Sequence, residues 1–441
     1  MIALSSEGSN GRSASPAPMD GSRQVRILAW VTAICLLGDS MYYIVLPLYW
    51  KDFGLDALWQ VGFLLSINRF VRLPLNPLVG WLYSRMSKRL GVMLAVMLAC
   101  LTTIGYGCLS GFTALLIARA LWGAAWSLLR IGGYLTVLET SSDSNRGQLL
   151  GSYNGIIAFG SLIGMLAGGV LADVIGVRPI ALLLGAIMLV GIPFAWKYVP
   201  SSQGGESSVA TKDKIINSET TNNPSSKKSI IQRWSLAISH IPATFWLVLA
   251  SGTGTAIVFF GVYLATLSAV IEAHLPGPGG TITLLGATLG AASVAGIVQA
   301  IRWAWSPYLS PRIGAWSDGP RGRLPLYTAS LAIAAVALAL LPLKLPFAAW
   351  LTLLLVAQLT NTAIVTLTDA LAADAATGSS RVAYMTTYTT VVDVGAALGP
   401  LLGFALLGQL GLAGLYQLCA GLLFLLAALW AAAIIRARVR A

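Results

Sequence analysis

Charged side chains inside long apolar stretches are the residues of this chain that could carry chemistry. Asp39 lies near the middle of the first such stretch, in LLGDSMYY. An ionised carboxylate is costly in hydrocarbon, and desolvation favours its protonated form, as a proton carrier requires. We therefore predict that Asp39 is a protonation site; the alternative is a fixed ion pair with a nearby arginine. Asp393, in a later stretch, is the second proton-coupling candidate, and a structural pair with Arg302 or Arg130 is the alternative for it.

Arginines outnumber acids within these stretches. They are Arg69, Arg72, Arg119, Arg130 and Arg302. Guanidinium groups bind carboxylate and phosphate in bidentate fashion, so the cationic excess favours an anionic substrate. We expect the substrate site to contain Arg69, Arg72, Arg130 and Arg302, together with Tyr42 and Tyr43 one turn beyond Asp39. The alternative is snorkelling, in which Arg72 and Arg302 extend toward the cytoplasm and Arg119 toward the outside.

Enzymatic machinery is missing from the sequence. There is no Walker loop GxxxxGK[ST], no HExxH motif and no Ser-His-Asp arrangement, and the two histidines are His240 and His274. The four cysteines lie inside apolar stretches without metal-ligand spacing. We therefore expect a protein that is not an enzyme and uses no metal or cofactor, with a proton gradient as its driving force.

The composition indicates which elements position the charged residues. Hydrophobic residues make up 56% of the 441-residue chain and charged residues 10%, whereas a soluble domain carries about a quarter charged residues. Many apolar runs are about 20 residues long, enough for a helix to cross the hydrocarbon core. We predict an all-α membrane protein with twelve transmembrane helices, at 28–50, 58–82, 91–110, 112–138, 147–172, 178–199, 243–271, 281–307, 325–342, 347–370, 383–407 and 412–435.

Polar segments divide these spans into two sets of six. The predicted segments are a disordered cytoplasmic N-tail over 1–26, a six-helix bundle over 27–199, a flexible cytoplasmic linker over 200–240, a second six-helix bundle over 241–435 and a basic C-tail over 436–441.

Basic residues indicate the orientation in the membrane. If both termini lie inside, the outer loops hold only Lys51, Arg178 and Lys344 of the 28 lysines and arginines. We therefore predict a multi-pass protein of the inner (cytoplasmic) membrane with both termini cytoplasmic. The net charge of +12 needs no nucleic acid, because an anionic inner leaflet attracts basic loops. The expected partners are the lipid bilayer and a small-molecule substrate, and we expect a monomer.

The two halves repeat each other at a fixed offset. Glu139 and Asp374 are 235 residues apart, at equivalent helix ends. The same offset relates Arg146, Tyr153, Gly160, Gly164 and Gly168 to Arg381, Tyr388, Gly395, Gly399 and Gly403. Parallel repeats of six spans are an architecture of transporters, with the substrate site at the interface between the halves.

The loop after the second span carries a glycine followed by a basic cluster, in GWLYSRMSKR, and the second half repeats it in GAWSDGPRGR. The residues are Gly80, Arg85, Lys88 and Arg89, and then Gly314, Asp318, Arg321 and Arg323. This pattern resembles the signature of the major facilitator superfamily, and the resemblance covers essentially the full length. Ser84 stands where that family usually has Asp.

In that family the loop helps to hold the cytoplasmic side shut. The resemblance therefore implies a gating role for these residues. We expect Glu139 to pair with Arg85, and Asp374 with Arg321 or Arg323, across the gate; solvated helix-end charges are the alternative.

Two further motifs suggest a subgroup. Arg119 and Gly123, in RALWGAAW, resemble the Arg-x-x-x-Gly motif of proton-coupled members. The glycines of the fifth span, Gly160, Gly164 and Gly168, resemble the motif of the drug/metabolite–proton antiporters, although Met165 replaces its proline and the Gly-Pro pair lies at Gly399–Pro400. Glycines at this spacing also allow helices to approach closely.

The expected function is secondary active transport by alternating access. The predicted substrate is a small, anionic organic solute, and the antiporter-like motifs favour proton-coupled export. Two alternatives remain open: a drug efflux pump for amphipathic compounds, and a non-transporting membrane sensor or scaffold that reuses the fold.

Overall fold

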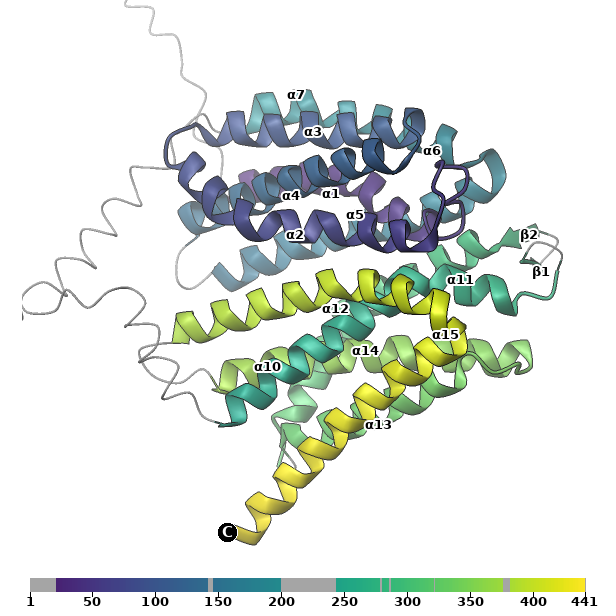
Figure 1. Cartoon of the computed structure of the whole chain (residues 1–441). Coiled ribbons are helices and arrows are strands. Elements are labelled where there is room, and N and C mark those ends of the chain that lie inside the picture. The colour runs from purple at the N-terminus through teal and green to yellow at the C-terminus, as the bar shows by residue number, and fades with distance from the viewer. Residues whose placement is uncertain are drawn as a thin grey trace, which may run out of the picture.

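The computed structural model describes residues 21–141, 146–199, 243–277, 280–284, 287–320, 322–375 and 381–440. Nearly all of these residues are helical, and the helices form two bundles that lie side by side (Figure 1). The predicted linker, most of the predicted N-tail and Arg321 lie outside the described residues.

The first bundle contains six spans, the last of which is built from two helices. Its elements are α1 (Gly21–Val45), α2 (Leu58–Tyr83), α3 (Lys88–Cys108), α4 (Phe112–Thr140), α5 (Arg146–Ile175), α6 (Val177–Leu189) and α7 (Gly191–Tyr198). Helix α1 begins at Gly21, inside the predicted N-tail, because its first turns pack inward: Val25 is fully buried and Gly21 lies against Thr140 of α4.

The second bundle repeats this order. Its elements are α10 (Ala243–Thr255), the π-helix η1 (Ala256–Tyr263), α11 (Leu264–His274), β1 (Thr281–Leu284), β2 (Ala287–Gly290), α12 (Ala291–Ser317), α13 (Arg323–Leu340), α14 (Phe347–Ala375) and α15 (Arg381–Arg440). The strands form one antiparallel hairpin. Helix α15 bends at Gly411, so it contains two spans, and it continues through the predicted C-tail.

The described helices agree with the predicted spans except for the eighth, where the predicted range 281–307 is wrong. Residues 281–284 and 287–290 form the β-hairpin, since β-branched residues such as Ile282 favour a strand, and α12 runs from Ala291 to Ser317.

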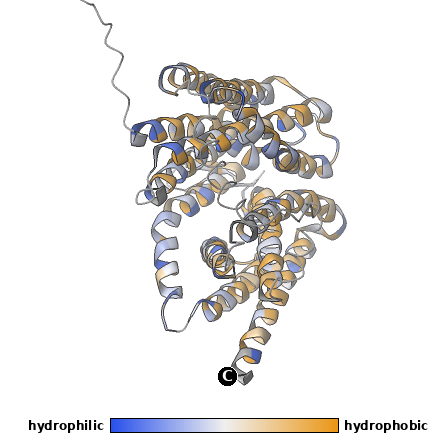
Figure 2. Cartoon of the chain, turned by 90° about the vertical axis from the view of Figure 1, so that its left-hand side faces the viewer, coloured by the Kyte–Doolittle hydropathy of each residue, from blue (hydrophilic) through white to orange (hydrophobic). Residues whose placement is uncertain are grey.

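Nine of the described helices are long and apolar enough to cross a membrane, and one of the nine is the stretch of α15 that Gly411 divides. Helices α2 and α12 are not among the nine, because prolines and arginines lower their mean hydropathy, but both are of spanning length. Large apolar side chains such as Leu101 and Phe424 are exposed. Figure 2 shows that hydrophobic residues occur along the helices of both bundles.

The repeat predicted from the sequence recurs in the backbone. Gly176 and Gly411 are 235 residues apart, and each has a positive φ, 86° and 68°, immediately before the last span of its half. A residue with a side chain is strained in that region, whereas glycine is not. The same turn therefore begins the last span of both bundles.

The glycines of α5 pack against α1. A side-chain carbon at Gly160 would lie 2.4 Å from Ala33 O, and one at Gly164 would lie 2.6 Å from Leu37 O. In the second half, Gly399 lies against Gly261 of η1 in the same way. These glycines therefore act as predicted, by allowing two helix backbones to approach closely.

The two bundles contact each other at the end that carries the β-hairpin, which we call the hairpin end; the opposite end, where α7 stops and α10 starts, is the linker end (Figure 1). Side-chain carbons at Gly169 and Gly62 would lie 2.3 Å from Ala292 O and 2.5 Å from Pro400 O. Helix α5 thus packs on α12, and α2 packs on α15, without room for side chains.

Candidate functional site

A cavity of about 460 Å³ lies between the two bundles. Larger hollows of about 750 and 660 Å³ are each bordered by one bundle only, so the central cavity is the better candidate for a site that both halves share. Seven of the residues that the sequence predicted for proton coupling or substrate binding border it: Asp39, Tyr43, Arg69, Arg72, Arg130, Arg302 and Asp393.

The cavity arginines come from α2, α4 and α12, and three of them lie over aromatic rings. The guanidinium carbon is 5.5 Å from the ring centroid for Arg72 over Trp126, 5.6 Å for Arg130 over Tyr134 and 5.0 Å for Arg302 over Trp303. Such contacts stabilise a cation partly removed from water.

Carboxylate partners are not found for these arginines within the described ranges. No ion pair within 4.0 Å involves Arg69, Arg72, Arg130 or Arg302. The Nε atoms of Arg69, Arg72 and Arg302 are buried without a hydrogen-bond partner. Buried donors of this kind are costly unless something accepts from them, so the wall of the cavity is chemically suited to an anion.

Asp39 and Arg119 form a buried ion pair between α1 and α4. The Arg119 side chain is fully buried, so the alternative in which it extends toward the outside is wrong. Its Nε donates to Leu64 O at 3.1 Å, and its Nη1 donates to the Tyr106 hydroxyl at 3.5 Å. Asp39 therefore borders the cavity while its charge is balanced by Arg119, as the ion-pair alternative anticipated.

Asp393 of α15 borders the cavity without such a pair. It is not within ion-pair distance of Arg302 or Arg130 in the described structure. The second bundle thus contributes one carboxylate and one arginine to the cavity wall.

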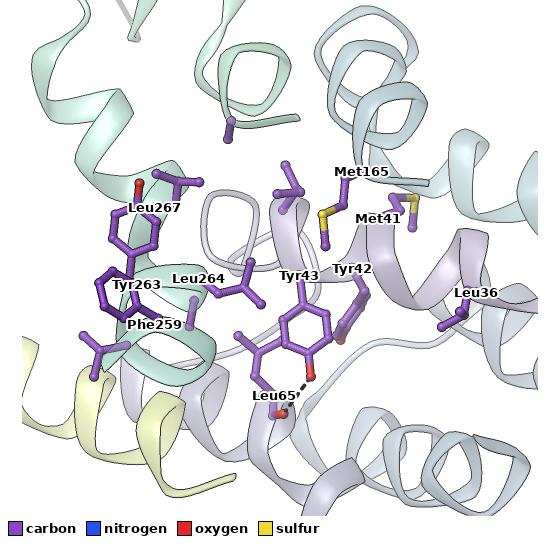
Figure 3. Packing of buried hydrophobic residues seen from close by; sticks show 14 of the residues in the cluster. Leu36, Met41, Tyr42, Tyr43, Leu65, Met165, Phe259, Tyr263, Leu264 and Leu267 are labelled. Carbon is purple, nitrogen blue, oxygen red and sulfur yellow. Dashed lines mark hydrogen bonds between the residues drawn. The ribbon is translucent and has the colours of Figure 1, made fainter. Parts of the chain in front are cut away.

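The two adjacent tyrosines of α1 have different surroundings. Tyr43 borders the cavity, donates to Leu65 O at 3.5 Å and lies beside Leu264 of the second bundle (Figure 3). Tyr42 instead stacks on Tyr106 with 4.2 Å between ring centroids and does not border the cavity. Adjacent residues of a helix do not share a face, which is why only one of the pair reaches this site.

The predicted gating charges form ion pairs within each half. Glu139 pairs with Lys88, so the predicted Glu139–Arg85 pair is wrong. Lys88 begins α3 beside the end of α4, whereas the Arg85 guanidinium lies 4.3 Å from the Trp81 ring centroid.

In the second half, Arg323 binds Asp374 at 2.8 Å, as predicted, and Asp318 at 2.7 Å. All three residues belong to the same bundle, so these pairs do not cross the gate in this structure.

The remaining predicted residues differ in their packing. Gly123 brings α4 against α2, since a side-chain carbon there would lie 2.6 Å from Asn68 O. A side-chain carbon at Gly80 or Gly314 would meet nothing within 4 Å. Arg89 faces α7, where its Nε donates to Val199 O at 2.8 Å, and it makes no gate contact here.

Asp173 is an interface residue that the sequence analysis did not single out. Located at the hairpin end of α5, it accepts from Ser293 N at 2.8 Å, Ser293 Oγ at 2.6 Å and the Tyr49 hydroxyl at 2.7 Å. A carboxylate at the first turn of α12 is also favoured by the helix dipole. The sequence did contain a signal for this residue. The repeat places Gly408 at the equivalent position of the second half, so Asp173 is an acid that the repeat does not explain.

Two repeated bundles of membrane-spanning helices with a site between them are an architecture that membrane transporters use. A sequence model of the Major Facilitator Superfamily matches residues 28–317, more than half of the chain, and this protein belongs to that superfamily.

Curated relatives align over part of the chain. The chain is 26% identical over 201 residues to a probable vesicular acetylcholine transporter-B of Danio rerio, covering 43% of this chain and 41% of the relative. It is 30% identical over 131 residues to the synaptic vesicular amine transporter of Homo sapiens, covering 30% and 26%. It is 23% identical over 153 residues to the quinolone resistance protein NorA of Staphylococcus aureus, covering 35% and 39%. The chain therefore spans less than half the length of these relatives.

Solved structures resemble the whole fold. The nucleoside transporter NupG gives a TM-score of 0.72 at 10% identity, covering 93% of this chain and 99% of that one. An inward-facing, unoccupied bacterial homologue of the human lysosomal transporter Spinster gives 0.71 at 14%, covering 94% and 97%. At these identities the likeness concerns the fold.

Proposed function

We propose that this protein is a proton-coupled secondary transporter of a small organic anion. The observation that carries the proposal is the central cavity, where four arginines from both halves have no carboxylate partner within the described residues. A transporter that needed no anion would have little reason to retain such costly groups in its core.

The charge balance of the cavity supports an anion over a cation. Asp39 is neutralised by Arg119, which leaves Asp393 as the one unpaired acid among the cavity residues. The same cavity is lined by Arg69, Arg72, Arg130 and Arg302, so its wall carries an excess of positive charge. The aromatic rings of Trp126, Tyr134 and Trp303 provide apolar contact for the rest of the solute.

Proton coupling is assigned to Asp39. Its carboxylate borders the cavity and is bonded to Arg119, so protonation of Asp39 breaks a buried ion pair between α1 and α4. The loss of a buried ion pair changes the free energy enough to shift the relative stability of two transport states. Asp393, which has no such fixed partner, is the second candidate for the proton.

The proposed orientation follows the basic loops. With both termini cytoplasmic in the inner membrane, the hairpin end faces outside and is closed by the contacts of α5 with α12. The cavity wall includes the exposed Asn154 toward the linker end, which supports a cavity that opens on that side and takes its solute from the cytoplasm. Export in exchange for protons is the proposed direction.

A second candidate is efflux of an amphipathic compound. It is supported by the similarity to a quinolone resistance protein and to amine and acetylcholine transporters, and by the aromatic cavity wall. The two candidates differ in the charge of the solute. The excess of arginines in the cavity disfavours a cationic solute.

Reconstitution tests these proposals. The purified protein is placed in liposomes with an imposed pH gradient, and solute-dependent proton flux is measured for di- and tricarboxylates and for amphipathic cations. Flux with anions supports the proposal. Flux with cations alone supports the second candidate, and binding of anions without any flux supports a sensor or scaffold instead.

A further inference from the structure

A second hollow, of about 750 Å³, lies outside the central site, between α3 and α7. Both helices lie on the side of the first bundle that faces away from the second bundle (Figure 1). The hollow is lined by Arg89, Met93, Ile192, Pro193, Trp196 and Lys197. It therefore combines two cations with an apolar wall on a face that the transport mechanism does not use.

Arg89 is held in place within this hollow. Its Nε donates to Val199 O at 2.8 Å, at the end of α7, and its guanidinium carbon is 5.9 Å from the Trp196 ring centroid. Within the part of the chain that the structure describes, the terminal nitrogens of the guanidinium form no hydrogen bond, so they are able to bind a ligand of the hollow. Lys197, one residue beyond Trp196, adds a second cation at the same level.

The surroundings of the hollow are those of a lipid-facing surface. The Trp196 side chain is 60% exposed, and Leu90, Leu94, Met97 and Phe194 are exposed beside it on the same two helices. Exposed apolar residues on a membrane-spanning bundle contact acyl chains. An occupant of this hollow therefore comes from the bilayer.

The second bundle has a hollow of about 660 Å³ that is lined by Arg323 and Trp430 among others, and the charges of that hollow are already paired. There Arg323 binds Asp318 and Asp374, and the buried Trp430 donates to Ser251 Oγ. No described carboxylate forms an ion pair with Arg89 or Lys197, so the hollow of the first bundle keeps its positive charge.

We propose that the hollow between α3 and α7 binds the headgroup of an anionic phospholipid. Arg89 and Lys197 bind the phosphate, Trp196 lies at the level of the headgroup, and the acyl chains follow Met93, Ile192 and Pro193. Basic pockets between membrane helices provide this kind of recognition. Because Lys88, next to Arg89, pairs with Glu139, a bound lipid would lie directly beside the ion pair that joins α3 to α4.

The test is native mass spectrometry of the full chain, purified in detergent and titrated with phosphatidylglycerol, phosphatidylcholine or inorganic phosphate. We expect one phosphatidylglycerol to bind in preference to phosphatidylcholine. The double variant Arg89→Gln/Lys197→Gln should lose roughly 30-fold in affinity, since each basic residue near an anionic lipid contributes a factor of about five. The single variant Lys197→Gln should lose roughly fivefold, and it provides the test if the double variant does not fold.

Arg436→Gln is the matched control, because Arg436 is an exposed arginine at the same end of the second bundle. It should bind the lipid as the unaltered protein does. Equal binding of phosphatidylcholine, equal loss in Arg436→Gln, or unchanged binding in the double and single variants would overturn the proposal. Saturable binding of inorganic phosphate that competes with the lipid would show a free-anion site instead.

Discussion

Lys88 and Glu139 form an ion pair between α3 and α4 that recurs, 235 residues later, as Arg323 and Asp374 between α13 and α14. The two pairs differ in exposure: the Lys88 side chain is 3% exposed and that of Glu139 28%, against 25% and 56% for Arg323 and Asp374. The removal of one member from a buried pair leaves an uncompensated charge, whereas an exposed pair contributes little.

Glu139→Gln should therefore destabilise the protein more than Asp374→Asn. We expect a loss of about 1–3 kcal/mol for Glu139→Gln and less than about 1 kcal/mol for Asp374→Asn. Denaturation of the purified protein in detergent measures both. Equal losses would contradict the difference in burial, and the charge-swapped pair Lys88→Glu/Glu139→Lys should recover part of the loss.

Asp39→Asn tests proton coupling at the Asp39–Arg119 pair. The amide cannot be ionised, so proton-driven transport should fall at least tenfold, while solute exchange without a pH gradient persists. Proteoliposomes with and without an imposed gradient measure the two activities. Full gradient-driven transport by Asp39→Asn would exclude Asp39 as the coupling site, and Asp393→Asn would then be the next variant to measure.

Arg69→Gln and Arg302→Gln test anion recognition from the two sides of the cavity. A hydrogen bond to a charged group contributes about 1.5–3 kcal/mol, so each variant should weaken anion binding roughly 10- to 100-fold. Equilibrium binding of the transported anion measures this. Arg178→Gln is the control, since Arg178 lies at the hairpin end and donates to Asp52 O and Ser110 Oγ. Retained affinity in both cavity variants would place the anion elsewhere.

The sequence could predict the repeat and the cavity charges, because both depend on spacing along the chain. The offset of 235 links Gly176 to Gly411 and Glu139 to Asp374, and apolar runs around Asp39 and Arg69 indicate that these residues lie at membrane depth. A charged residue at that depth must face a partner or a cavity, because exposure of its charge to hydrocarbon is costly.

The choice of partner could not be predicted, because it depends on distances across the bundle. Arg85 and Lys88 were both able to reach Glu139 by their place in the loop, and only the start of α3 beside α4 selects Lys88. Asp173 and Ser293 are 120 residues apart and in different halves, so their contact depends on how the bundles meet.

Asp173 joins the two halves at the hairpin end, and its loss should favour the open state of that end. Asp173→Ala removes the acceptor for Ser293 and Tyr49, which contribute three hydrogen bonds. Spin labels on exposed Val174 of α5 and Ala273 of α11 should then show a larger fraction of long distances.

The control for that measurement is Asp56→Asn, an exposed acid at the same end. Its distance distribution should match that of the unaltered protein. If Asp173→Ala gives the same distribution as well, the close backbone contacts of α5 with α12 are sufficient to hold this end closed.

The glycines of α5 allow a matched test of close helix packing. A side-chain carbon at Gly164 would lie 2.6 Å from Leu37 O, whereas one at Gly155, on the same helix, would meet nothing within 4 Å. Gly164→Val should therefore destabilise the protein by about 1–3 kcal/mol through overpacking. Gly155→Val should reduce the free energy of unfolding much less. Both variants change the intrinsic helix preference by the same amount, but Gly155→Val introduces no clash. Thermal unfolding in detergent measures both, and equal losses would show that helix preference, and not the contact with α1, sets the requirement for glycine.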